Sequence, residues 1–251
     1  MELGHRPGVI GYPMKVKLLS YTPNIEKIIA ASSLATRRNP AHKIIDTITE
    51  NEARKHIGRV MSYGHESISE FAFFIFSVEG VSRVLTHQLV RHRIASYLQM
   101  SSRHVNLSHL GFITPPTISK NVEANRIFNE VINNSKKNYI ELLKMGIPKE
   151  DARYLLPDSI ETHIVIGMNG RSLNHYFGLR LCQKAQWEIR ELANKMRDLV
   201  KDKNSSIFWS EPRPCVIRGK CPQEKSCGFY KTNKFEEERI KYLKGYPHEK
   251  K

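Results

Sequence analysis

Residues 91–104, RHRIASYLQMSSRH, concentrate side chains that can bind a phosphate group. Arginine offers two parallel hydrogen bonds to a phosphate, and serine hydroxyls supply further donors. Nucleic-acid binding is the competing interpretation, but it usually adds aromatic side chains on which bases stack, and only Tyr97 lies nearby. The stretch therefore predicts a nucleotide cradle formed by Arg91, Arg93, Ser101, Ser102 and Arg103.

The composition also favours an anionic partner. Forty Lys and Arg residues against 25 Asp and Glu residues give a formal charge of +15, which attracts nucleic acids, nucleotides and phosphorylated cofactors alike. The chain has no uninterrupted apolar run of about 18 residues, and residues 1–20 lack the apolar block of a secretory signal. We expect a cytoplasmic protein without a membrane partner.

The chain lacks several common signatures of catalytic, metal-binding and nucleotide-binding sites. The patterns GxSxG, HExxH, GxxxxGK and GxGxxG are all missing from the sequence. If the protein is an enzyme, we expect a carried cofactor to perform the difficult step, while Arg and His side chains place charge around it.

The four cysteines predict no metal site by their spacing. Cys182 lies within a helical pattern, where a small buried side chain is the expected role. Cys215, Cys221 and Cys227 are each separated by five residues, whereas zinc ligands usually pair two to four residues apart. We expect an ordered loop rich in Pro and Gly, with a metal or redox role as the alternative.

Hydrophobic periodicity predicts helices that alternate with a few short strands. The expected strands are 15–20, 71–78 and 162–168, with the second mostly buried on both faces and ended by Gly80. Residues 95–118 are expected to form a loop or irregular strand. The expected helices are 24–38 after a Thr22 cap, 44–62, 81 to about 90, 120–145, 148–156 and 171 to about 202.

This pattern is typical of the α+β class. We expect a single domain over residues 1–205, with long helices flanking a small mixed or antiparallel sheet, followed by a basic extension over 206–251 that contains Cys and Pro. The helix that ends near residue 90 delivers Arg91 and Arg93 to its carboxyl end, where cations also stabilise the helix dipole. That structural role explains one or two of these arginines and leaves the others for binding.

Residues 91–103 fit RHRxxSxxxxSxR, and this pattern resembles the signature of the flavin-dependent thymidylate synthases. Residues 64–70, GHESISE, resemble the family's GHE[ST]xxxE segment. Later blocks follow in the order typical of the family, namely 151–153, 169–173, 179–180 and 185–188. The resemblance covers roughly residues 15–205.

The resemblance implies a reductive methylation of deoxyuridine 5′-monophosphate (dUMP) by a homotetramer. Methylenetetrahydrofolate supplies the carbon, and FAD reduced by NADPH supplies the hydride, without a Cys or Ser nucleophile on the protein. The family's arginine that stabilises the N3-deprotonated uracil corresponds to Arg180, and a fixed guanidinium beside developing negative charge lowers the barrier. No nucleic acid is expected as the main partner.

The resemblance also assigns the remaining site residues by position. A catalytic histidine that orders the flavin and folate region corresponds to His65. The FAD ligands correspond to Ser67, Arg91, His92, Arg93, Gln99, Asn169, Gly170, Arg171 and His175. The nucleotide ligands correspond to Gln88, Arg91, Gln99, Ser101, Ser102, Arg103, Arg153 and Arg180.

Two positions depart from the family pattern. Many members have Asn-Glu where this chain has Leu98-Gln99; Gln99 still offers an amide to the uracil edge, but Leu98 offers no polar group. His104 stands where Tyr is common. Two alternatives therefore stay open: a diverged paralogue that acts on another pyrimidine nucleotide, and a non-catalytic protein that binds RNA through the basic loop.

Overall fold

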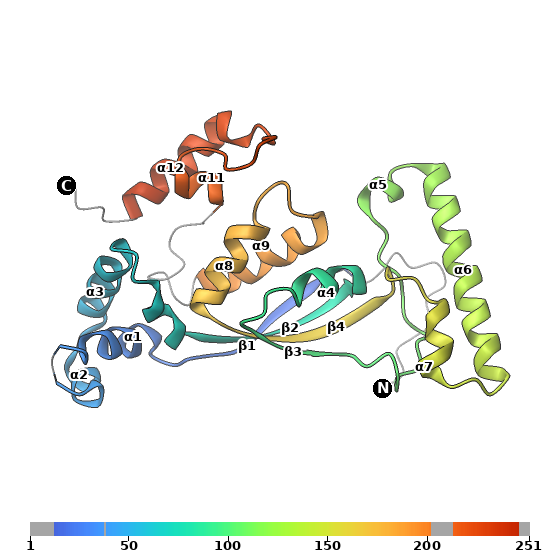
Figure 1. Ribbon diagram of the computed structural model, residues 1–251, viewed down its shortest axis with the longest axis horizontal. Helices are drawn as coiled ribbons and strands as arrows, with labels where there is room; N and C mark the ends of the chain where they lie inside the picture. Colours follow the sequence, from blue (N-terminus) through green and yellow to red (C-terminus); the bar gives the residue numbers. More distant parts are fainter. Residues whose placement is uncertain (1–12, 38, 202–212, 246–251) are drawn as a thin grey trace. The chain divides into compact units, whose positions relative to one another are not determined.

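The computed structural model describes residues 13–37, 39–201 and 213–245, and these include one four-stranded sheet and several helices (Figure 1). The strands are β1 (Lys15–Tyr21), β2 (Phe73–Ser82), β3 (Ser96–Gln99) and β4 (Glu161–Asn169), in the order β1-β2-β4-β3. The α+β class with a small antiparallel sheet is confirmed.

The hydrogen bonds at the two ends of β2 and β4 show why this pair is antiparallel. The Arg83 amide donates to the carbonyl of Ile160, and the Gly170 amide donates to the carbonyl of Ala72. The residue numbers on one strand therefore rise as those on its partner fall, which is the antiparallel arrangement.

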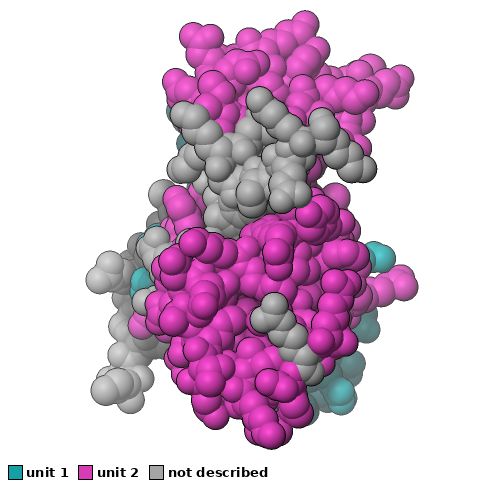
Figure 2. All heavy atoms as spheres, turned by 90° about the vertical axis from the view of Figure 1, so that its left-hand side faces the viewer, with its two compact units in different colours: residues 1–15, 77–91, 97–166 teal, residues 16–76, 92–96, 167–251 magenta. Residues whose placement is uncertain are grey.

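Contacts divide the chain into two compact units, coloured separately in Figure 2. Of the described residues, the first unit holds 13–15, 77–91 and 97–166, and the second holds the rest. Strands β2 and β4 contribute residues to both units. Among the described residues, no helix is long and apolar enough to cross a membrane.

The first unit is built around one long helix and a small core. Its helical elements are α4 (Arg83–Leu89), α5 (Pro116–Ser119), α6 (Val122–Lys144), α7 (Lys149–Ala152) and η2 (Arg153–Leu155). The fully buried Tyr139 of α6 accepts a hydrogen bond from the Leu107 amide at 3.2 Å, which fixes the loop after β3 on this helix. The core residues are Leu107, Phe112, Ile132, Tyr139, Ala152 and Ile160.

The second unit contains most of the helices. They are α1 (Ile25–Leu34), α2 (Ala41–Thr47), α3 (Glu50–Ser62), η1 (Glu66–Phe71), α8 (Gly170–Arg180), α9 (Trp187–Lys201), α11 (Pro214–Arg218), η3 (Phe229–Lys231) and α12 (Asn233–Gly245). Helix α8 packs against η1 and α9, so the segment around residue 66 and the segment around residue 175 meet.

Two predicted helices are each divided in the structure. The helix expected over 44–62 is α2 followed by α3, because Thr49 forms a capping box with Glu52 and starts a new helix. The helix expected over 171–202 ends at Arg180 and resumes at Trp187. The Gln186 side chain accepts hydrogen bonds from the first amides of α9, which stabilises the second start.

Three predictions about β2 and its surroundings were wrong. Gly80 does not end the strand, because it adopts φ +70° within it and the strand continues to Ser82. The strand is not buried on both faces, because Phe74 and Phe76 are fully buried whereas Phe73 is 43% exposed. Thr22 does not cap α1, because the N-cap residue of that helix is Asn24. The Thr22 hydroxyl instead accepts a hydrogen bond from the Phe73 amide.

Candidate active site

Ser102 is the centre of a polar cluster in the first unit. It is buried, and its hydroxyl accepts hydrogen bonds from Arg153 at 2.6 Å and from Arg83 at 3.4 Å. Two guanidinium groups from segments about 70 residues apart in sequence therefore converge on one hydroxyl. Arg83 was not predicted as a site residue, since it begins α4 without any recognisable spacing to the loop at 100.

Arg103 joins the same cluster through a carboxylate. Its Nε donates to Glu150 at 3.1 Å, and Arg153 donates to the backbone carbonyl of Glu150 at 2.9 Å. Three guanidinium groups and one carboxylate leave an excess of two positive charges. Arg103 and Glu150 also line an open pocket with His104, Pro148 and Lys149, whereas Arg83, Ser102 and Arg153 are not among its lining residues. The guanidinium groups of the cluster are donors of the kind that a phosphate dianion accepts.

Gln99 has its amide orientation fixed by two buried threonines. The Nε2 atom donates to Thr86 at 3.1 Å and to Thr162 at 3.4 Å. The Thr86 hydroxyl itself donates to the Arg83 carbonyl, so it can only accept from Gln99. No described residue hydrogen-bonds Gln99 Oε1, which is thus the polar atom that a ligand would meet.

The other residues of the first unit that are predicted to bind the nucleotide lie nearby in sequence but make different contacts. Arg91 is exposed just after α4, and Gln88 is half-buried within it. Ser101 accepts from the Arg103 amide at 3.3 Å and so shapes the loop. Among the described residues, neither Gln88 nor Arg91 is bonded to Ser102.

In the second unit, Arg180 is bonded to His92. Arg180 is the last residue of α8, and its Nε donates to His92 Nε2 at 3.1 Å. The His92 ring lies edge-on against Tyr176, with 4.9 Å between ring centroids, and it is also an edge-on neighbour of His175 at 5.9 Å. Sequence reasoning assigned His92 to the flavin and did not predict that it contacts Arg180.

His92 is an uncharged acceptor. Burial is the main cause that lowers its pKa to about 4, and the charges of Arg180 and His175 lower it further. At neutral pH the imidazole is therefore neutral, and it must carry its proton on Nδ1 because Nε2 accepts from Arg180. The guanidinium keeps its charge and is fixed in direction.

The start of α8 joins two more of the sequence blocks. Arg171 forms an ion pair with Glu70 at 2.5 Å, and Asn169 caps the helix by accepting from the Ser172 amide at 2.8 Å. Gly170 is required here, because a Cβ would lie 2.7 Å from the Ser69 carbonyl oxygen. The structure thus brings the 64–70 segment and the 169–173 block into contact. Glu70 is the last residue of the 64–70 segment, and the family resemblance assigned it no role.

The remaining predicted residues of this unit are polar and mostly accessible. His65 and Ser67 are exposed at the start of η1, and Arg93 and His175 are exposed as well. Their side chains carry hydrogen-bonding groups of the kinds that the phosphates and ring edges of a dinucleotide such as FAD can bind.

Comparison with known proteins agrees with these blocks. A family model described as thymidylate synthase complementing protein matches residues 17–204. The flavin-dependent thymidylate synthase of Clostridium tetani is 42% identical, covering 86% of this chain and 93% of that protein. Those of Pyrococcus horikoshii and Geobacter sulfurreducens are also 42% identical, covering 84% of this chain and 90% and 91% of their own lengths. The chain belongs to the thymidylate synthase complementing protein family.

Proposed function

We propose that this chain is a flavin-dependent thymidylate synthase that methylates dUMP to deoxythymidine 5′-monophosphate (dTMP). Its family and the activity of the flavin-dependent thymidylate synthases to which it is similar support this activity. Methylenetetrahydrofolate would supply the one-carbon unit, and bound FAD, reduced by NADPH, would supply the hydride. The proposed location is the cytoplasm.

The observation that carries the proposal is the Arg180–His92 pair. The pyrimidine must accumulate negative charge before C5 can attack a one-carbon electrophile. A guanidinium that is already oriented by a neutral imidazole stabilises this charge without reorganising during the reaction. Removal of such a donor typically costs about 10²–10³ in kcat.

The Ser102 cluster is proposed to hold the phosphate of dUMP. Arg103 and Arg153 would donate charge-assisted hydrogen bonds, with Arg83 as an addition to the predicted set. Gln99 would offer its carbonyl oxygen to the uracil edge. The proposed nucleotide set is Arg83 together with the residues predicted from the sequence, which are Gln88, Arg91, Gln99, Ser101, Ser102, Arg103, Arg153 and Arg180.

The flavin would be held by donors at the start of α8, around η1 and after α4. His65 is proposed to order this region, and the proposed FAD ligands are Ser67, Arg91, His92, Arg93, Gln99, Asn169, Gly170, Arg171 and His175. By resemblance, we propose a homotetramer in which one active site takes residues from more than one subunit.

Product analysis tests this function. The purified chain, loaded with FAD, is incubated with NADPH, methylenetetrahydrofolate and dUMP, and the nucleotides are identified by mass. We expect dTMP only when all four small molecules are present. Absence of dTMP with intact bound flavin would contradict the proposal. Methylation of another pyrimidine nucleotide in preference to dUMP would instead support the paralogue suggested by Leu98 and His104.

A further inference from the structure

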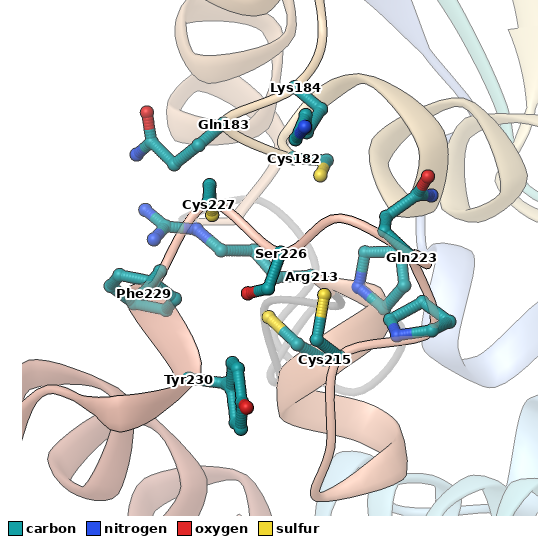
Figure 3. A pocket seen from close by; sticks show the side chains of 13 residues that line it. Cys182, Gln183, Lys184, Arg213, Cys215, Gln223, Ser226, Cys227, Phe229 and Tyr230 are labelled. Atoms are coloured by element: carbon teal, nitrogen blue, oxygen red, sulfur yellow. The ribbon is translucent and has the colours of Figure 1, made fainter.

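All four cysteines of the chain line one pocket, and none of its lining residues is assigned to nucleotide or flavin (Figure 3). Cys182 follows α8, Cys215 belongs to α11, and Cys221 and Cys227 lie in the segment between α11 and η3. The sequence prediction that Cys182 lies inside a helix was wrong, because α8 ends two residues earlier. That break is what brings Cys182 to the other three.

The thiols are unpaired and near one another. None of the four is in a disulfide. Burial is the main cause that raises the pKa of Cys215, and Cys182 and Cys221 lie close enough to raise it further. Figure 3 shows the labelled side chains of Cys182, Cys215 and Cys227 arranged around the same space.

A positively charged group with unused donors accompanies the thiols. Arg213 lines the pocket, and its Nε and Nη1 atoms are buried without a hydrogen-bond acceptor among the described residues. Its guanidinium stacks over Phe229 at 4.4 Å and lies 3.7 Å from Glu238, which holds it in place. Buried donors require acceptors, and metal-bound sulfur is one.

The C-terminal segment has little apolar core of its own. Among the residues whose burial the structure describes, its hydrophobic cluster has Val216 and Phe235 buried and Cys215, Phe229 and Tyr230 partly buried. Small units of this kind are usually held by disulfides or metals, because burial alone cannot offset the loss of chain entropy. The rings of Pro214, Pro222, Phe229 and Tyr230 also line the pocket, together with the polar Gln183, Lys184, Gln223 and Ser226, and the rings would shield a bound group from water.

The arrangement favours a cluster over a single ion. Two thiolates on one zinc ion lie at most about 4.6 Å apart, because each Zn–S bond is about 2.3 Å. Among the described residues, no three His, Cys, Asp or Glu side chains are placed to bind one metal ion. An iron–sulfur cluster of the four-iron class gives each cysteine its own iron and so accepts thiolates that stand further apart.

We propose that Cys182, Cys215, Cys221 and Cys227 hold one four-iron iron–sulfur cluster, which fastens the segment after residue 213 to the loop after α8. Each thiol releases its proton to solvent when it binds iron, and Arg213 donates to the sulfur atoms and offsets part of their negative charge. This proposal replaces the expectation, drawn from spacing alone, that no metal is bound.

Metal analysis of the full chain tests the cluster. The protein is produced and purified without oxygen, and iron, zinc and acid-labile sulfide are measured per chain. We expect about four iron and four sulfide per chain, with an electron paramagnetic resonance signal after reduction by dithionite. One zinc per chain without sulfide, disulfides among the four cysteines, or no bound metal would each overturn the proposal.

Variants assign the cluster to this pocket. Cys182→Ser, Cys215→Ser, Cys221→Ser and Cys227→Ser should each lose most of the iron and sulfide. Gln223→Ala, an exposed pocket residue without sulfur, should keep both. Full iron and sulfide in Cys182→Ser would show that the cluster, if present, is not bound as proposed.

Reconstitution removes the dependence on variants that fail to fold. Wild-type protein is stripped with a chelator, then treated under argon with ferrous iron, sulfide and dithiothreitol. Uptake of about four iron per chain should slow proteolytic cleavage after residue 213. Failure to take up iron, or an unchanged cleavage rate, would contradict the cluster or its fastening role. Neither result bears on dTMP formation, which is measured separately.

Discussion

Arg180 is oriented by an imidazole rather than by a carboxylate, and this difference matters for its proposed chemistry. A carboxylate partner would cancel most of the guanidinium charge, whereas the neutral His92 leaves it available to an anionic ligand. The lowered pKa of His92 is partly caused by Arg180 itself. Arg180 therefore helps to keep its own hydrogen-bond partner uncharged.

We expect Arg180→Ala to lower kcat by about 10²–10³, because it removes the donor that stabilises charge on the pyrimidine. FAD should stay bound, which flavin absorbance measures. Arg126→Ala is the matched control, since Arg126 is an exposed residue of α6 that pairs only with Glu123 and Glu130. Wild-type turnover of the Arg180 variant would remove this residue from the mechanism.

The lowered pKa of His92 also makes stability depend on pH. Between the unfolded value of 6.5 and the folded value of about 4, the unfolded chain binds a proton that the folded chain does not. Stability conferred by this group is thus present above pH 6.5 and is lost as the pH falls, by about 1.4 kcal/mol per pH unit.

Urea unfolding at pH 7 and at pH 5 measures this dependence. His92→Gln should reduce the pH dependence of the free energy of unfolding, because the amide does not titrate. His87→Gln, at an exposed position of α4, should leave it unchanged. An identical slope in wild type and His92→Gln would mean that His92 is not the group concerned.

Arg103 is expected to contribute to phosphate binding rather than to the chemical step. Arg103→Ala should raise the KM for the nucleotide about tenfold, the effect of one charge-assisted contact, with little change in kcat. Glu150→Gln provides a control of opposite charge, because it removes the carboxylate that Arg103 now contacts. The KM of the Glu150→Gln variant for the nucleotide should not rise. Unchanged kinetics in Arg103→Ala would place the phosphate elsewhere.

At the scale of elements, the sequence predicted the long helices and missed the boundaries between adjacent ones. Residues 120–145 were predicted almost as α6 appears, because a clear apolar period runs through them. The break after Thr47 was missed although Thr49 and Glu52 form a readable capping box. The break after Arg180 is stabilised by local contacts, because Arg190 donates to the carbonyls of Gln183 and Ala185, seven and five residues earlier. These bonds follow no hydrophobic period, so the periodicity did not predict the break.

The capping box at Thr49 makes a prediction for α3. Thr49→Ala should lower the free energy of unfolding by about 1 kcal/mol, because the first-turn amide of Glu52 loses its acceptor. Thr47→Ala is the matched control, since its hydroxyl only donates back to carbonyls at the end of α2 and should cost less than about 0.5 kcal/mol. Equal losses in denaturant unfolding would show that the cap contributes nothing.

At the scale of the whole molecule, sequence order did not tell which motifs would meet. Ser102 and Arg153 were assigned to one ligand by resemblance, and the structure joins them directly. The contact between Glu70 and Arg171 spans 101 positions, and no periodicity predicts it. The participation of Arg83 and the clustering of Cys182 with the three later cysteines were likewise invisible, since both depend on where helices begin and end.

The proposed homotetramer predicts that a variant with a low kcat and a variant with weak nucleotide binding can restore each other. Arg180→Ala and Arg103→Ala/Arg153→Ala chains are unfolded together, refolded as a mixture and assayed for dTMP at a dUMP concentration far below the KM of the double variant. If one site takes Arg180 from one subunit and the Ser102 cluster from another, random mixing leaves about one quarter of the sites intact. If each site uses a single subunit, no site escapes mutation and no activity returns. Each variant refolded alone is the control, and sedimentation measures whether four chains associate; a monomer with full dTMP activity would contradict the assembly outright.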